Sequence, residues 1–157
     1  MDSRTYVTCE VVGKSADELI KELTGDQCKC VLSNDAKGMM LSSAWSSGER
    51  RVVSFARTSV EGLGFTRNAQ TQEIWNRIQE LGGSLCEPGD GPEIRRVLDQ
   101  SRYESIYLAM EPIDGKIFVL ERSGNGKIFL LASPCDMQQE WHPASEWILF
   151  RLPAKYL

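Results

Sequence analysis

The stretch "YESIYLAMEPIDGKIFVLERSGNGKIFLLASP", residues 103–134, decides the fold class of this chain. It holds three apolar runs, and the segments "IDG" and "SGNG" between them contain the Asp-Gly and Asn-Gly pairs that favour tight hairpin turns. The pattern predicts three antiparallel strands, over residues 103–112, 115–122 and 126–134. A fourth strand is predicted over residues 145–153, "SEWILFRLP".

The two strands that begin with "GKIF" are apolar on both faces. In the first of them, Ile117 and Val119 point to one side of the sheet, while Phe118 and Leu120 point to the other. A sheet with one face in water alternates between apolar and polar residues, whereas a sheet covered on both faces does not. We therefore expect helices, the N-terminal strands, a second copy or a partner to cover the second face.

The sequence pattern of the N-terminal third predicts further strands and one helix. Residues 4–13 alternate as a strand does, and Ser15 with Glu18 forms a capping box that begins a helix ending at Gly25. The residues "SNDAKG", 33–38, indicate a turn between two short strands. Three strands are expected in this part of the chain, over residues 28–33, 37–45 and 50–58.

Two further helices separate the two groups of strands. The segment 71–83 places Ile74, Trp75 and Ile78 on one helical face, and 92–100 follows a capping pattern of Asp90 with Glu93. The predicted fold class is therefore α+β: one domain over residues 1–157 with a mainly antiparallel sheet of about seven or eight strands. We expect the three helices to pack mainly on one face of that sheet.

The length, cysteine content and charge of the sequence argue against secreted, membrane-spanning and nucleic-acid-binding proteins. The chain of 157 residues has no apolar run long enough for a signal peptide or a membrane span, so a soluble cytoplasmic protein without membrane contact is expected. An odd number of cysteines, five, fits a reducing compartment. The formal charge of −4 argues against a nucleic-acid partner, because neutralising phosphates requires a surplus of Lys and Arg.

Few residues have a pattern that supports catalysis. Cys135 and the single histidine, His142, are the one candidate pair of nucleophile and base, yet no glycine-rich oxyanion turn follows Cys135. Cys28 and Cys30 share a strand face, but a zinc site needs about four ligands. The sequence therefore predicts no catalytic residues, no metal site and no cofactor, and Cys135 with His142 remains the alternative.

Arginines and tryptophans are the candidate binding residues. Arg51 and Arg57 are predicted to share a strand face, and Arg67 follows in the next loop; an arginine fork suits carboxylates and phosphates. The alternative is that these arginines are solvated and balanced by nearby glutamates. Trp45 and Trp141 lie in stretches that resemble loops or strand ends, and exposed tryptophan often anchors an interface. The alternative is that each ring folds back over the edge of the sheet.

The predicted function is a small acidic protein-binding module. Its size, its charge and the lack of a catalytic group are typical of an inhibitor or immunity-type protein that neutralises a basic toxin or enzyme, because opposite charges speed encounter. The alternative is an arginine-lined nucleotide- or nucleic-acid-binding protein, or a small Cys/His enzyme. Homodimerisation through the hairpin strands is compatible with either function.

Overall fold

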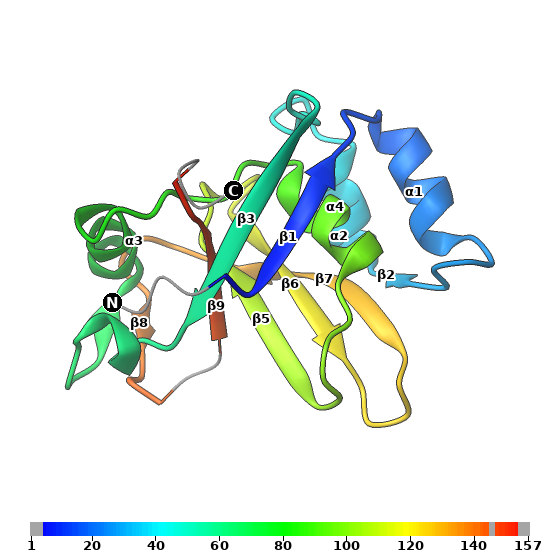
Figure 1. Ribbon diagram of the computed structural model, residues 1–157. Helices are drawn as coiled ribbons and strands as arrows, with labels where there is room; N and C mark the ends of the chain where they lie inside the picture. Colours follow the sequence, from blue (N-terminus) through cyan, green and yellow to red (C-terminus); the bar gives the residue numbers. More distant parts are fainter. Residues whose placement is uncertain (1–4, 145–146, 154–157) are drawn as a thin grey trace.

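A seven-stranded sheet forms the centre of the computed structural model, which describes residues 5–144 and 147–153 (Figure 1). Its strand order is β1 (Val7–Val11), β3 (Arg51–Thr58), β9 (Trp147–Arg151), β5 (Glu104–Leu108), β6 (Lys116–Arg122), β7 (Ile128–Pro134) and β2 (Val31–Leu32). A separate two-stranded sheet pairs β4 (Ala69–Gln70) with β8 (Glu140–Trp141). The helices are α1 (Ala16–Thr24), α2 (Asn34–Met40), α3 (Thr71–Glu80) and α4 (Asp90–Val97), with a 3-10 turn η1 (Glu61–Leu63).

The α+β class is confirmed, but the sheet is mixed. The predicted hairpins of β5, β6 and β7 are antiparallel, with Leu120 paired to Ile106 on one side and to Leu130 on the other. However, β9 runs parallel to β5, and β2 runs parallel to β7. The chain leaves β7, forms β8 and returns to place β9 between β3 and β5. Position 4 and positions 145–146 of the predicted strands lie outside the described residues.

The strand predicted over residues 37–45 is wrong, because residues 37–40 belong to helix α2 and residues 41–45 form the turn that follows it. Ser33, which we expected to begin a turn, caps the helix by accepting a hydrogen bond from the amide of Ala36 at 3.1 Å. Ala36, Met39 and Met40 are buried at the three- and four-residue spacing of a helical face. The strand predicted over residues 28–33 shortens to β2, because Lys29 has a left-handed backbone with φ of 52°.

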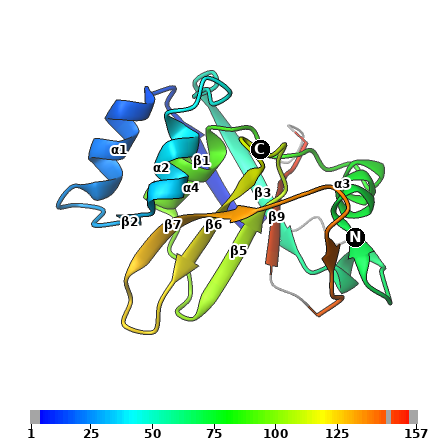
Figure 2. The same cartoon turned by 180° about the vertical axis from the view of Figure 1, so that it is seen from behind.

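The structure has four α-helices rather than three among its described residues, and they lie on both sides of the sheet. Helix α4 contacts β1 as well as β6 and β7, so the sheet curls around it. Figures 1 and 2 show α1 and α2 on the same side as α4, and α3 beside β8 on the other. A Cβ atom added at Gly83, just after α3, would lie 2.7 Å from Cδ2 of Phe150 in β9, so the end of α3 packs closely on β9.

The second face of the β6–β7 hairpin is covered only in part. Val119 is buried, whereas Phe129 and Leu131 on the same face are half-buried and Val31 in β2 is 40% exposed. The β4–β8 sheet reaches this face through Trp141, whose ring meets Tyr107 edge-on at 5.3 Å. None of the helices formed by residues 5–144 and 147–153 has the length and apolar character that crossing a membrane requires.

Candidate functional site

The three arginines predicted as a group lie in three different places, each with its own carboxylate. Arg51 pairs with Glu87 at 2.5 Å, Arg57 with Glu104 at 2.7 Å, and Arg67 with Glu73 at 3.0 Å. Arg51 and Arg57 are six residues apart on β3, which separates them by about 20 Å. The structure therefore does not combine them into one anion-binding site.

Arg57 lies between two aromatic rings. Its guanidinium carbon is 4.3 Å from the centre of the Tyr6 ring and 4.1 Å from the centre of the Trp147 ring. The Tyr6 hydroxyl donates a hydrogen bond to Glu104 Oε1 at 3.2 Å, while Glu104 Oε2 pairs with Arg57. Burial, followed by the charge of Glu104, raises the pKa of Tyr6 to about 12, so the hydroxyl keeps its proton at neutral pH.

Tyr103 lies one residue before β5, next in the chain to Glu104 of this cluster. The residue is 87% exposed. Its backbone has a left-handed conformation, with φ of 64°. The amide of Tyr103 donates to the carbonyl of Arg122 at 2.8 Å, and its ring lies directly against Gly124, where a Cβ atom would collide with it. We call Tyr6, Arg57, Tyr103 and Trp147 the aromatic–arginine surface.

The aromatic–arginine surface lies at one end of the sheet (Figure 1). The strands β1, β5 and β9 begin there, and β3 ends there. Trp147 is 38% exposed and Arg57 is 27% exposed at its side chain, so a partner can reach both. Sequence reasoning named Arg57 but missed Tyr6, Tyr103 and Trp147. Only the pairing of β3 with β9 and of β9 with β5 could have connected them.

The two tryptophans predicted as anchors have mainly internal contacts. Trp141 is 7% exposed, and its indole nitrogen donates to Thr71 Oγ1 at 2.8 Å. Its ring also lies 6.2 Å from the ring of Trp75. Trp45 packs against the core as a half-buried side chain, and its indole nitrogen has no hydrogen-bond partner among the described residues.

Cys135 and His142 face different surroundings. Cys135 is buried, and its sulfur lies 3.9 Å from Thr71 Oγ1. His142 is exposed, its Nδ1 accepts a hydrogen bond from the amide of Ala144 at 3.0 Å, and it lines a cavity of about 490 Å³ together with Phe65 and Arg67. Cys135 does not line that cavity. No base among residues 5–144 and 147–153 therefore makes a hydrogen bond with this thiol.

The buried thiols are expected to react slowly with iodoacetamide at neutral pH. Burial raises the pKa of Cys9 and of Cys30 to about 11, and it also raises the pKa of Cys135. Since the thiolate is the reactive form, two pKa units reduce the reactive fraction about a hundredfold. Mass spectrometry of timed alkylation, with the urea-unfolded chain as the reference, measures the rate at each cysteine. Rapid labelling of Cys135 that His142→Ala abolishes would instead identify a catalytic pair.

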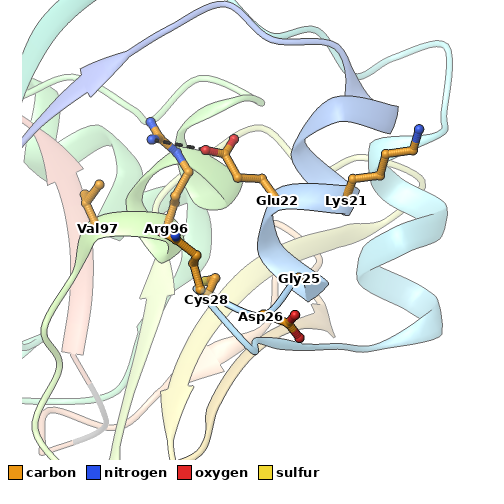
Figure 3. Close-up of a pocket in the computed structure, with 8 residues that line it drawn as sticks. Lys21, Glu22, Gly25, Asp26, Cys28, Arg96 and Val97 are labelled. Carbon is orange, nitrogen blue, oxygen red and sulfur yellow. Dashed lines mark ion pairs between the residues drawn. The ribbon is translucent and has the colours of Figure 1, made fainter.

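A cavity of about 480 Å³ lies between the ends of α1 and α4, and Figure 3 shows the side chains that line it. Glu22 turns toward Arg96 at 3.8 Å, whereas Lys21 points away from it. Arg96 also pairs with the buried Glu93 at 2.8 Å. With two basic and two acidic side chains in its lining, namely Lys21, Arg96, Glu22 and Asp26, this cavity selects no ligand charge.

Neither metal chemistry nor similarity assigns a function. Within residues 5–144 and 147–153, no three His, Cys, Asp or Glu side chains come close enough together to hold a metal ion. No protein-family model, curated protein or solved structure matches the chain.

Proposed function

We propose that this protein is a cytoplasmic protein-binding module whose partner docks on the aromatic–arginine surface. The conformation of Tyr103 carries the proposal: a large ring is held 87% exposed on a left-handed backbone. Such a backbone costs on the order of 1–3 kcal/mol in a residue other than glycine, and strain of this kind clusters at functional sites. An exposed ring contributes little to the stability of the core, so a contact with another molecule would explain why a tyrosine occupies this position.

The composition of the surface supports the same proposal. Tyr, Trp and Arg are the side chains that contribute most binding energy at protein interfaces. Arg57 keeps the rings of Tyr6 and Trp147 in place by stacking with both, and Glu104 neutralises its charge. Rings that are already ordered lose less conformational entropy when a partner binds. The surface therefore offers aromatic anchors without an unpaired buried charge.

The net charge favours a basic partner. At −4, the chain attracts a positively charged protein at long range, which raises the association rate. In this proposal the charge accelerates encounter, and the aromatic rings provide the affinity. An inhibitor or immunity-type protein that neutralises a basic toxin or enzyme has these properties, and this is the role that we propose.

Tyr103→Gly is expected to weaken partner binding by about thirtyfold while leaving the protein at least as stable as the wild type. The loss corresponds to about 2 kcal/mol, the size of an interface hot spot. Glycine adopts a φ of 64° without strain, so stability does not fall. Trp147→Ala is expected to weaken binding to a similar extent. The measurement uses affinity capture from extracts of the source organism with the tagged protein, then calorimetry with the purified partner and urea unfolding of each variant.

Leu41→Ala is the matched control, because Leu41 is an apolar side chain, 55% exposed, at the end of α2. It is expected to bind the partner as the wild type does. Unchanged affinity in both Tyr103→Gly and Trp147→Ala would contradict the proposed surface. Sedimentation of the chain as a dimer that Tyr103→Gly dissociates would replace the basic partner with a second copy.

A further inference from the structure

A second cavity of about 480 Å³ lies between the turn at Lys29, the end of α4 and the β6–β7 turn. We propose that this cavity, called the basic cavity below, binds the phosphate group of a small phosphorylated molecule. None of the four residues of the aromatic–arginine surface lines this cavity, so phosphate binding here does not require the proposed function.

The lining of the basic cavity is rich in cations. Lys29, Arg122 and Lys127 line it, and the guanidinium of Arg102 lies against Gly126, which also belongs to the lining. Lys29, Lys127 and Arg102 are exposed. Such a concentration of positive charge is unexpected in a chain whose net charge is −4, since solvated lysines and arginines are usually interspersed with carboxylates.

Among the described residues that line the basic cavity, Asp99 alone carries a carboxylate. It pairs with Arg122 Nη1 at 3.2 Å, and its side chain is 99% exposed, so solvent screens much of its charge. Arg122 is held independently of this pair, because it also donates to the carbonyls of Gln100 at 2.7 Å and of Gly126 at 3.2 Å. The guanidinium would therefore stay at the cavity if Asp99 turned away toward water.

A buried guanidinium behind the wall strengthens the positive field. Arg95 is 1% exposed and donates to Gln100 Oε1 at 2.8 Å and to the carbonyls of Phe129 and Leu98 at 3.3 Å. Leu98 lines the basic cavity, so Arg95 lies directly behind it. In the part of the chain that the structure describes, no carboxylate forms an ion pair with Arg95, and its Nε has no hydrogen-bond partner. Its charge is screened little, because it is removed from water.

The shape and charge of the basic cavity select the ligand class. Arginine forks and lysine ammonium groups both suit phosphate oxygens, and several cations around one carboxylate favour a group with more than one negative charge. A volume of about 480 Å³ fits the size of small-molecule sites. A nucleic-acid strand would bring many phosphates toward a chain of net charge −4, so a small phosphorylated molecule fits better.

Titration with pyrophosphate and with inorganic phosphate tests the basic cavity. Amide chemical shifts of Asn125, Gly126 and Lys127 are expected to move in proportion to occupancy. Pyrophosphate is also expected to slow the labelling of Cys28, because this residue lines the cavity. Lys29→Asn with Lys127→Gln should weaken pyrophosphate binding about tenfold, since each exposed charge contributes about two- to fivefold. Asparagine is chosen at Lys29 because it tolerates the φ of 52°.

Asp99→Asn is expected to act in the opposite direction and to tighten pyrophosphate binding about two- to fivefold. Arg67→Gln and Trp147→Ala are the controls, and neither should change the affinity, because Arg67 and Trp147 do not line the cavity. Pyrophosphate that shifts no amide of the β6–β7 turn, or that binds more weakly to Asp99→Asn, would overturn the proposal. Since Trp147→Ala tests the protein partner and leaves the cavity intact, the two proposals can fail separately.

Discussion

Asp90→Ala is expected to lower the free energy of unfolding by about 3–5 kcal/mol, because it leaves a buried arginine without its partner. Asp90 is 1% exposed and accepts two hydrogen bonds from Arg151, from Nε at 2.6 Å and from Nη2 at 2.7 Å. It also accepts from the amide of Glu87 at 2.8 Å, which fixes the start of α4. This pair joins α4 to β9, so its loss affects the centre of the sheet.

Glu87→Gln is the control for Asp90→Ala. Glu87 contacts the same guanidinium at 3.3 Å and Arg51 at 2.5 Å, but its side chain is 45% exposed, so solvent weakens both pairs. A pair of this kind contributes about 0–1 kcal/mol, so little change is expected. Urea unfolding followed by tryptophan fluorescence measures both variants. Equal losses in the two variants would show that the burial of Asp90 does not set the strength of the pair.

Arg95→Ala is the second substitution with a large expected effect, a loss of about 3–5 kcal/mol. It removes one of the largest fully buried side chains and leaves a cavity behind. Gln100 Oε1 would lose its donor inside the protein, as would the carbonyls that Arg95 reaches in β6 and β7. A buried acceptor without a donor costs about 1–3 kcal/mol.

Arg102→Gln is the matched control for Arg95→Ala. The guanidinium of Arg102 is exposed and donates to the carbonyl of Gly124 at 3.1 Å, so its loss is expected to change stability by less than about 0.5 kcal/mol. Thermal and urea unfolding measure both variants. A gain in stability for Arg95→Ala would contradict the prediction, since it would mean that desolvating the guanidinium costs more than its hydrogen bonds return.

Local sequence signals predicted those elements whose cause is local. Asn-Gly and Asp-Gly turns predicted the β6–β7 and β5–β6 hairpins, and the capping box of Ser15 and Glu18 predicted α1. The same reasoning misread Ser33, which begins either a turn or a helix. Whether a helix or a turn follows Ser33 depends on the burial of Met39 and Met40, which is a tertiary effect. The parallel pairing of β9 with β5 has no local signal, because it connects two distant segments.

The candidate sites were harder to predict than the fold for the same reason. Arg57 was named from its residue type, but the rings that flank it come from before β1 and from the start of β9. Lys29, Arg122 and Lys127 meet at the basic cavity because β2 pairs with β7, although Lys29 is far from the other two in sequence. Residue type suggested which side chains could bind, and only strand order showed which of them meet.

The central position of β9 affects the order of assembly during synthesis. The strands β1 and β3 leave the ribosome first, followed by β5, β6 and β7, yet β9 separates the two groups in the sheet. Until residues 147–151 emerge, the inner edges of β3 and β5 have no strand between them and offer open backbone groups. The nascent chain therefore passes through a stage prone to wrong edge pairing, and insertion of β9 ends it.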